Sequence, residues 1–108
     1  MNSDFCIILV MCRSLKEADG MASSLLSKRF AACANITKNV SSKFWWSGKI
    51  EKAREVLLSL KARRSEFKKI EKEIKRLHSY EVPEIIAIPI IMGSDDYLGW
   101  LKNSTKQK

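Results

Sequence analysis

The architecture of this chain is set largely by one stretch, which reads His78-Ser79-Tyr80-Glu81-Val82-Pro83-Glu84-Ile85-Ile86-Ala87-Ile88-Pro89-Ile90-Ile91. It joins a strongly periodic basic pattern, typical of a helix, to a nearly unbroken apolar run, and it holds the only histidine of the sequence. From Val82 onward, β-branched residues dominate over a length typical of a strand. Pro83 and Pro89 lack the backbone N–H that an interior strand needs, so the stretch predicts an edge strand. An apolar edge strand invites a pairing partner, and the junction at His78 is where we expect a functional site.

Length and composition indicate one small domain spanning residues 1–108, with enough apolar side chains for a core but few to spare. The apolar runs are shorter than the roughly twenty residues that cross a bilayer, so no membrane span is expected. No basic segment precedes the first apolar run, so we expect no signal peptide. The formal charge of +8 suits an anionic partner such as nucleic acid, but it also serves solubility and decides nothing alone.

The three cysteines predict a reducing environment. An odd number of cysteines cannot all pair within one chain. Cys6 and Cys12 also fall on the same predicted strand, which is too extended for a bridge between them. We therefore expect free thiols and a cytoplasmic location.

The first part of the chain predicts a strand and a helix. Phe5–Cys12 is continuously apolar, as in a central strand that is covered on both faces. Ser14 and Glu17 form a capping-box pattern, and a core-facing helix is expected to run to about Arg29. Its apolar residues recur at helical spacing and are Ala18, Met21, Ala22, Leu25, Leu26 and Phe30.

A hairpin follows, with arms at Ile36–Trp46 and Lys49–Ala62 around a Ser47-Gly48 turn. Both arms exceed the usual strand length of about five or six residues, so the tip is expected to project beyond a compact core. Trp45 and Trp46 lie at that tip. Because large exposed apolar patches are rare on monomers, burial against a neighbouring subunit is favoured over folding back onto the same sheet.

The second half predicts two more helices around the edge strand. Ser65 is placed to cap the first of them, and Glu71 and Lys75 are spaced for a helical ion pair. A short last helix is expected from Ser94, with a polar tail that frays from Lys102. The apolar stripe of the first helix consists of Phe67, Ile70, Ile74 and Leu77. The resulting order, β-α-β-β-α-β with a terminal helix, is the ferredoxin-like α+β arrangement.

Candidate site chemistry centres on His78. Nucleophilic catalysis needs a thiol beside this imidazole, and no local signature supports such a pair. Cys12, Cys33 and His78 offer soft ligands for copper or zinc, but no two of them have the close spacing of a zinc module. Glu84 lies within the apolar run and, if buried, needs a cation such as Lys61. The sequence has no glycine-rich phosphate loop, so nucleotide hydrolysis has no support.

Several separated segments together resemble the CutA divalent-cation tolerance family. Their order and spacing cover nearly the whole chain, and the motifs in register are specific where one alone would only be suggestive. The segments are Arg29-Phe30-Ala31-Ala32-Cys33-Ala34-Asn35-Ile36, Ser42-Lys43-Phe44-Trp45-Trp46-Ser47-Gly48-Lys49-Ile50-Glu51, His78-Ser79-Tyr80-Glu81-Val82-Pro83-Glu84-Ile85, and Gly93 through Tyr97 to Trp100.

The resemblance implies a ferredoxin-like subunit that assembles as a compact homotrimer, with the hairpin and the edge strand pairing between subunits. It also implies a role in tolerance to divalent metals, copper being the ion usually named, and no established catalytic reaction. His78 matches the histidine position most often linked to metal in the family. A small inter-subunit cavity, whose ligand is unknown, is implied at the positions of Asn35, Lys61, Tyr80, Glu84, Tyr97 and Trp100.

The chain departs from the family pattern at several positions. Ser79 replaces the usual proline after the histidine, Phe44 the usual tyrosine and Ala62 the usual threonine. Leu77 stands where a second histidine sometimes occurs in relatives. These changes leave the fold untouched and make His78 the sole histidine ligand that the sequence offers.

We expect a non-enzymatic, trimeric metal-tolerance or signalling protein that binds copper or another divalent cation through His78 with a thiol, for which we name Cys33. The alternative is a small-molecule-sensing module, because the trimeric nitrogen-regulatory signalling proteins share this topology. A third class, single-stranded nucleic-acid binding on the sheet, is disfavoured because Phe5 and Cys12 bracket only aliphatic residues on the central strand. Neither nucleic acid nor membrane is therefore an expected partner.

Overall fold

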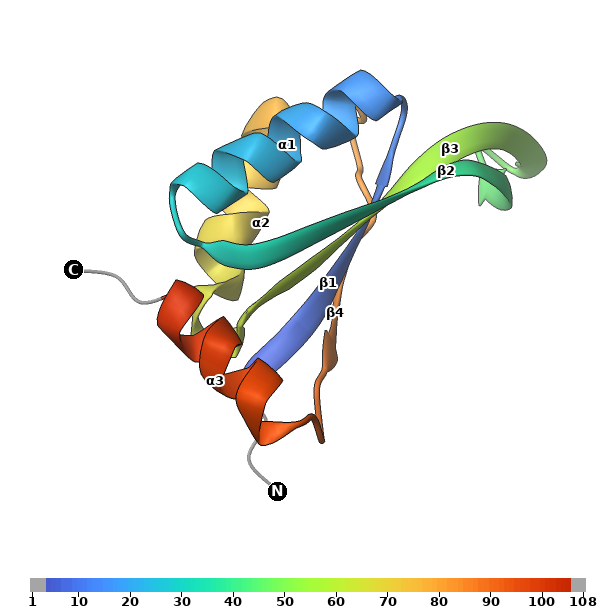
Figure 1. Cartoon of the computed structure of the whole chain (residues 1–108). Coiled ribbons are helices and arrows are strands. Elements are labelled where there is room, and N and C mark those ends of the chain that lie inside the picture. The colour runs from blue at the N-terminus through green and yellow to red at the C-terminus, as the bar shows by residue number, and fades with distance from the viewer. Residues whose placement is uncertain (1–3, 106–108) are drawn as a thin grey trace.

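The structure, a computed structural model, describes residues 4–105 and contains a four-stranded sheet with helices packed against it (Figure 1). The strands lie in the order β2-β3-β1-β4, and all neighbours are antiparallel. The predicted ferredoxin-like α+β arrangement with a terminal helix is therefore confirmed. The elements are β1 (Phe5–Cys12), α1 (Leu15–Ser27), β2 (Ala31–Trp46), β3 (Lys49–Arg63), the 3-10 turn η1 (Arg64–Glu66), α2 (Phe67–Leu77), β4 (Ile85–Pro89) and α3 (Asp95–Ser104).

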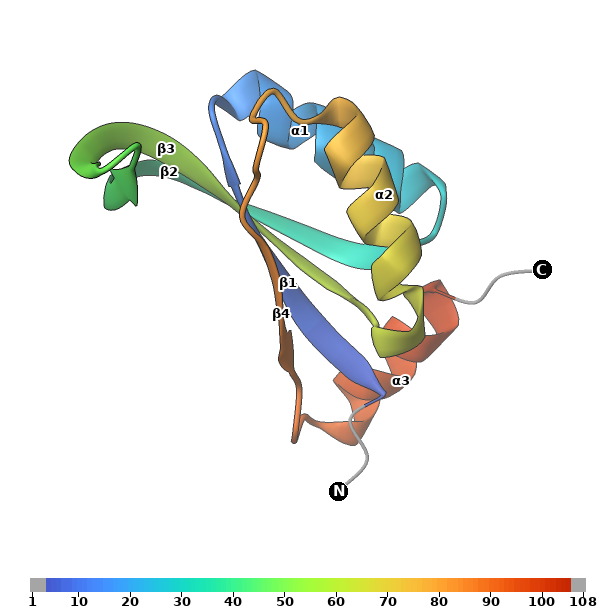
Figure 2. The ribbon, with the colours of Figure 1, turned by 180° about the vertical axis from the view of Figure 1, so that it is seen from behind.

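β1 lies in the interior of the sheet, as predicted, because β3 and β4 pair with it on either side. Val10, for example, is opposite Leu58 of β3 and Ile85 of β4. α1 and α2 cover one face of the sheet (Figures 1 and 2), and the even-numbered residues of β1 are buried on that face. The expectation that β1 is covered on both faces is wrong for the single chain. Its odd-numbered residues, such as Leu9, stay half-buried on the opposite face, which we call the open face.

α1 begins where its cap was predicted. Ser14 Oγ accepts a hydrogen bond from the Glu17 backbone N–H at 3.2 Å. Glu17 Oε1 reaches one residue beyond the usual capping box and accepts from the Arg13 N–H at 3.0 Å. The helix ends at Ser27, slightly earlier than expected. Leu26, which was expected in the core, is 39% exposed.

The long hairpin of β2 and β3 is confirmed, and its distal half projects from the sheet (Figure 1). Ser47 and Gly48 have φ angles of 51° and 79°, as in the type I′ turn whose twist matches the flanking strands. Trp45 is 72% and Trp46 51% exposed. The tip therefore does not fold back onto its own sheet within one chain.

α2 starts later than its predicted cap. Ser65 lies within η1, and the N-cap side chain of α2 makes no capping hydrogen bond. The apolar stripe is as predicted, with Ile70 and Ile74 fully buried in the core. Glu71 and Lys75 form the expected ion pair at 3.4 Å.

β4 is an edge strand, as predicted, because β1 is its only strand partner within residues 4–105. It is shorter than expected, since pairing with β1 starts only at Ile85, opposite Val10. Val82 lies in the loop before the strand and is exposed. The β-branched run is thus divided between a loop and a short strand.

α3 is capped as predicted by Ser94 Oγ, which accepts from the Tyr97 N–H at 3.2 Å. The expectation that the chain frays from Lys102 is wrong, because α3 continues to Ser104. The guanidinium of Arg63 donates to the Lys102 carbonyl at 2.7 Å and to Thr105 Oγ1 at 2.9 Å. These bonds hold the last turn of α3 to the end of β3. The rest of the predicted tail, 106–108, lies outside the described residues.

Candidate functional site

His78 is fixed at the C-terminus of α2, against the end of β1. Its side chain is fully buried. Nδ1 accepts a hydrogen bond from the Tyr80 backbone N–H at 3.0 Å, which places the ring proton on Nε2, 2.7 Å from the Met11 carbonyl oxygen. In this arrangement the imidazole is neutral, and both of its nitrogens are engaged with the main chain.

Cys12 and Glu17 complete a group of metal-ligand side chains around His78, which we call the junction cluster. One ligand atom from each residue lies within 4.8 Å of the other two, and no other group of three such side chains occurs in residues 4–105. Cys12 ends β1, Glu17 comes from the first turn of α1 and His78 follows α2. Three elements therefore converge on one point. A thiolate, an imidazole and a carboxylate together suit zinc or copper.

The surroundings set the charge of each member of the junction cluster. Burial raises the pKa of the Cys12 thiol to about 12, and the nearby Glu17 and Glu55 carboxylates add to the rise. Burial also opposes ionisation of Glu17, but hydrogen bonds from Ser79 and Arg13 outweigh it and lower the pKa of this carboxyl. At neutral pH the cluster therefore holds a protonated thiol beside a carboxylate, and a metal ion has to displace the thiol proton.

Cys33 does not join His78 within one chain, contrary to the predicted pair. It lies on the open face of β2. Cys33 is opposite Lys61 of β3, which is in turn opposite Ile7 of β1, whereas His78 contacts Met11. Ile7 and Met11 are separated by roughly 13 Å along the strand, given its usual rise per residue. The thiol that the chain itself brings to His78 is that of Cys12.

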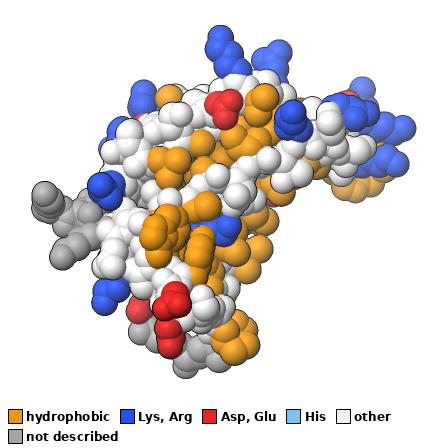
Figure 3. Space-filling model, in the orientation of Figure 1, with side chains coloured by type: hydrophobic (Ala, Val, Ile, Leu, Met, Phe, Trp, Pro, Cys, Tyr) orange, Lys and Arg blue, Asp and Glu red, His pale blue; other side chains and the backbone are white. Residues whose placement is uncertain are grey.

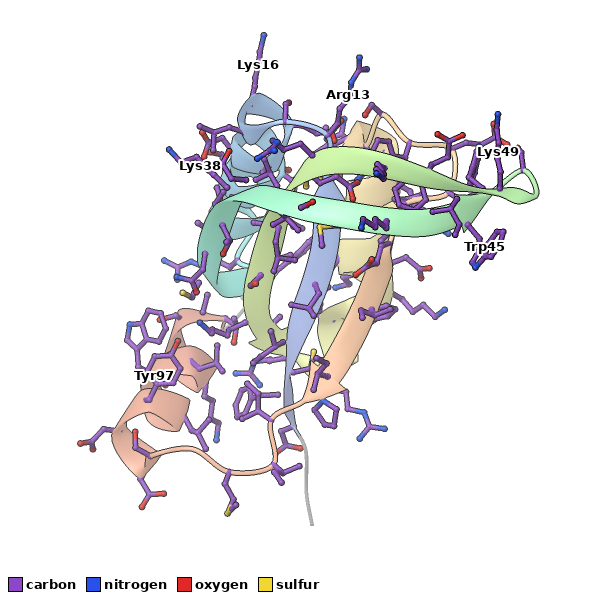
Figure 4. The ribbon with its side chains drawn as sticks, turned by 90° about the vertical axis from the view of Figure 1, so that its right-hand side faces the viewer. Arg13, Lys16, Lys38, Trp45, Lys49 and Tyr97 are labelled. Atoms are coloured by element: carbon purple, nitrogen blue, oxygen red, sulfur yellow. The ribbon has the colours of Figure 1, made fainter. Side chains whose placement is uncertain are left out.

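A second polar group forms on the open face near α3, and we call it the open-face cluster. Lys61 Nζ donates to Asn35 Oδ1 at 2.7 Å, and the Cys33 thiol donates to the same oxygen at 3.5 Å. Burial, followed by the neighbouring Cys33 side chain, raises the pKa of Tyr97. The Tyr97 ring packs on Trp100 with a centroid separation of 5.4 Å. Tyr97 lies at the α3 end of the molecule, away from Trp45 at the hairpin tip (Figure 4).

The residues predicted to line one cavity are divided between the two ends of the sheet. Four belong to the open-face cluster, while Tyr80 and Glu84 lie on the loop between α2 and β4. Glu84 is exposed rather than buried, and Lys61 bonds to Asn35 instead. The expected ion pair between Glu84 and Lys61 is therefore not formed within one chain.

A pocket of about 620 Å³ lies between the distal half of the hairpin and this loop. Tyr80 forms part of its wall and donates its hydroxyl to Glu55 Oε2 at 2.7 Å. Neither Glu55 nor Glu17 was expected at a site from the sequence. Glu17 was interpreted only as a cap. The sequence signal for Glu55 is its position two residues before Leu57 on the same strand. Residues at this spacing share one face of the sheet.

Exposed apolar side chains are concentrated on the hairpin and along β4. Figure 3 shows hydrophobic side chains gathered over the middle of the molecule and Lys and Arg side chains around the hairpin. Ile50 on the hairpin and Ile86 on β4 are among the large exposed residues. No helix in the described part of the chain has the length and apolar character of a membrane span.

Comparison with known proteins identifies the family. Residues 6–104 match the family described as CutA1 divalent ion tolerance protein. A divalent-cation tolerance protein CutA of Archaeoglobus fulgidus is 41% identical over 99 residues, which cover 92% of this chain and 96% of that protein. The chloroplastic protein CutA 1 of Oryza sativa subsp. japonica is 39% identical over 101 residues, which cover 94% of this chain but 57% of that protein. The chain thus spans little more than half the length of its plant relatives.

Solved structures give the same result. The periplasmic divalent cation tolerance protein CutA from Archaeoglobus fulgidus has a TM-score of 0.92 at 40% identity, covering 94% of this chain and 99% of that chain. CutA1 from Oryza sativa has a TM-score of 0.92 at 38% identity, covering 96% of this chain and 95% of that chain. These matches do not favour the alternative of a nitrogen-regulatory type of sensor. The chain belongs to the CutA1 divalent ion tolerance protein family.

Proposed function

We propose that this chain is a homotrimeric divalent-cation tolerance protein that binds copper or another divalent cation, in a binding or signalling role rather than a catalytic one. The observation that supports this most is the junction cluster. In a member of a divalent-ion tolerance family, ligand side chains from three elements converge at His78. Thiolate and imidazole are the soft ligands that copper and zinc prefer.

Metal binding at the junction cluster requires changes at two of its members. Cys12 has to lose its proton, since the thiolate is the ligand, and the charge of the metal supplies the driving force. His78 has to release the Tyr80 N–H from Nδ1, the atom that lies 3.8 Å from Glu17 Oε1. Metal at Nδ1 therefore loosens the loop that carries Tyr80, which gives the protein a conformational response to the ion.

Cys33 is the second candidate thiol, and it depends on the trimer. Within one chain it lies on the open face, far from His78. It reaches a metal site only if a neighbouring subunit places its open face against the junction cluster of the first. Substitution of each cysteine separately distinguishes the two arrangements.

The proposal of a trimer is supported by apolar side chains on free sheet edges. Ile86 and Ile88 of β4 are 48% and 47% exposed, and Met92 beyond it is 79% exposed. Trp45 adds a large apolar surface at the hairpin tip. Unpaired apolar edges of this kind are ordinarily covered in a stable soluble protein. We infer that the hairpin of one subunit pairs with the β4 edge of the next.

Trimer assembly also provides a way to complete the predicted cavity for a small ligand. The open-face cluster of one subunit then meets the loop between α2 and β4 of another, so that the two ends of the sheet supply opposite walls. The side chains assigned to this cavity are Asn35, Lys61, Tyr80, Glu84, Tyr97 and Trp100.

A cytoplasmic location is supported by the state of the cysteines. Cys6, Cys12 and Cys33 are all free, and the junction cluster needs Cys12 as a thiol. Free thiols persist in reducing compartments and become oxidised in secreted environments.

Equilibrium titration with copper(I) or zinc(II), against a competing chelator, tests the metal site. We expect Cys12→Ser and His78→Ala to weaken binding by roughly tenfold or more each, because each removes a ligand. Cys6→Ala, which removes a buried thiol outside the cluster, serves as the matched control. Loss of affinity in Cys33→Ser but not in Cys12→Ser would assign the thiol to the neighbouring subunit. Equal affinity of the wild type and all variants would remove the junction cluster from the site.

A further inference from the structure

We propose that Glu17 is a positioning residue of the metal site: its carboxylate ties the main chain that follows Cys12 to the main chain that follows His78. The inference rests on metal binding at the junction cluster, as proposed above, and concerns what holds that site in shape. We call this connection through Glu17 the carboxylate bridge. It is formed within one chain and needs no contribution from a neighbouring subunit.

The two oxygens of Glu17 bind amides on different segments of the chain. Oε1 accepts from the Arg13 N–H at 3.0 Å, and Oε2 accepts from the Ser79 N–H at 2.9 Å. Arg13 is the residue after Cys12, and Ser79 is the residue after His78. One side chain therefore spans the two segments that carry the thiol and the imidazole.

A second connection joins the same segments on the other side of the thiol. The His78 ring lies with Nε2 2.7 Å from the Met11 carbonyl oxygen. Met11 precedes Cys12, and Arg13, which the carboxylate bridge holds, follows it. The main chain of Cys12 is thus tied on both sides to the segment that ends α2. It cannot move away from the imidazole without loss of a hydrogen bond.

A helix cap alone does not account for the bonds of Glu17. The carboxylate of a capping box binds the amide of the N-cap residue, which here is Ser14. Glu17 instead binds Arg13 and reaches Ser79, 62 positions further along the sequence. The Ser79 hydroxyl also hydrogen-bonds to the carboxylate. Hydrogen bonds to an ionised acceptor are roughly twice as strong as neutral ones, so the bridge is suited to order both segments.

The carboxylate bridge remains available when the ion binds. Metal at Nδ1 of His78 displaces the Tyr80 N–H, whereas the Ser79 N–H is bound to Glu17 rather than to the ring. Each carboxylate oxygen can accept more than one bond, so contact of the ion with Glu17 is compatible with the bridge. Ligands that are already in place leave less ordering for the ion to impose, and outer partners of metal ligands typically contribute about 10- to 100-fold in affinity.

Replacement of Ser79 separates the bridge from the ligands themselves. Ser79→Pro removes the N–H and the hydroxyl and leaves all three side chains of the junction cluster in place. His78 has φ of −80° and ψ of 141°, in the extended region that a residue before proline adopts. Ser79→Ala removes the hydroxyl alone and keeps the N–H. Glu71→Gln, which removes a carboxylate of α2 outside the cluster, is the matched control.

Titration with zinc(II) against a competing chelator, together with the rate of zinc release to excess chelator, tests the proposal. We expect Ser79→Pro and Glu17→Gln each to weaken zinc binding by about tenfold or more and to release zinc faster. In Glu17→Gln one oxygen becomes an NH₂ donor, so at least one arm of the bridge is lost. Ser79→Ala should have a smaller effect, and Glu71→Gln should bind like the wild type.

Amide hydrogen exchange of the metal-free protein, followed by NMR, gives a readout without the ion. The Arg13 and Ser79 amides should exchange slowly in the wild type, because both are bound to the carboxylate. Glu17→Gln should speed exchange at one or both of them, and Glu71→Gln at neither. Equal exchange in the wild type and Glu17→Gln would overturn the bridge.

The zinc measurements separate this proposal from the one on which it rests. Wild-type affinity in both Ser79→Pro and Glu17→Gln would overturn the positioning role and leave the metal site standing. A loss in Glu17→Gln alone would make Glu17 a ligand and would also overturn it. Absence of zinc binding in the wild type would overturn the proposed function together with this inference.

Discussion

The Nε2 atom of His78 lies 2.7 Å from the carbonyl oxygen of Met11, so the ring that ends α2 is tied to the main chain of the central strand. The same ring accepts the Tyr80 N–H. His78→Ala removes both bonds and leaves a cavity, and we expect a loss of about 2–4 kcal/mol in the free energy of unfolding. Urea denaturation measures it. Lys72→Ala, an exposed change on α2, should stay within about 0.5 kcal/mol, and an equally small effect of His78→Ala would contradict the anchoring role.

Glu73 joins the two helices and gives the fold a defined acid sensitivity. Hydrogen bonds from Arg76, and then from Ser24 and Lys28, hold the pKa of this carboxyl well below its usual range. A carboxyl with a lowered folded pKa contributes stability above its unfolded pKa of about 4.3, and that stability is lost as the pH falls below this value.

We therefore expect the urea midpoint of the wild type to drop as the pH falls from about 4.5 toward 2, within the window that linkage defines. Glu73→Gln should be less stable than the wild type at neutral pH and should show a shallower drop in acid. Glu71→Gln, which removes a carboxylate paired with Lys68 and Lys75 within α2, controls for the loss of one carboxylate. Identical pH profiles of the wild type and Glu73→Gln would show that Glu73 does not cause the sensitivity.

Substitutions at the two residues of the hairpin turn are expected to change the stability of the protein in opposite directions. Ser47 and Gly48 both have positive φ, and asparagine tolerates this region better than serine. Ser47→Asn should stabilise the protein by about 0.5 kcal/mol. Gly48→Ala should cost about 1 kcal/mol. Since an added Cβ at Gly48 meets nothing within 4 Å, that cost is in the backbone alone. Equal urea midpoints for Gly48→Ala and the wild type would rule out the strained turn.

Assembly can be tested through the β4 edge. Sedimentation equilibrium should give a mass near three times the 12.4 kDa of the chain. Ile86→Lys combined with Ile88→Lys places two charges on the exposed edge and should release monomers, because a charged edge does not pair. Lys72→Glu, on the outer surface of α2, is the control for changed charge. A folded monomer of the wild type at micromolar concentration would contradict the trimer and the shared cavity.

Features that depend on a few adjacent residues could be predicted from the sequence. The caps at Ser14 and Ser94 and the turn at Ser47-Gly48 are local, and the structure contains all three. The cap predicted at Ser65 is the exception, because this residue lies within η1. Pro83 and Pro89 indicated an edge because a missing N–H acts locally. By contrast, the length of a strand depends on the neighbouring strand. The pairing of β4 with β1 starts only at Ile85, so the β-branched residue Val82 lies in the loop before it.

The candidate site was less predictable because it combines distant elements. His78 was expected, but its partner Glu17 looked like a simple cap until α1 and α2 were brought side by side. Cys33 was named as the thiol from the sequence, whereas the register of the sheet places Cys12 beside the ring and Cys33 near α3. Glu55 could not be placed at a pocket without the fold of the loop that carries Tyr80.

X-ray absorption spectroscopy of the zinc-loaded protein tests the central claim most directly, because zinc is a redox-inert probe of the ligands. A site at Cys12 and His78 predicts one sulfur at about 2.3 Å together with nitrogen or oxygen ligands at about 2.0–2.1 Å. The sulfur should disappear in Cys12→Ser and persist in Cys33→Ser. A shell of nitrogen and oxygen alone in the wild type, or sulfur that survives in Cys12→Ser, would contradict the junction cluster as the metal site.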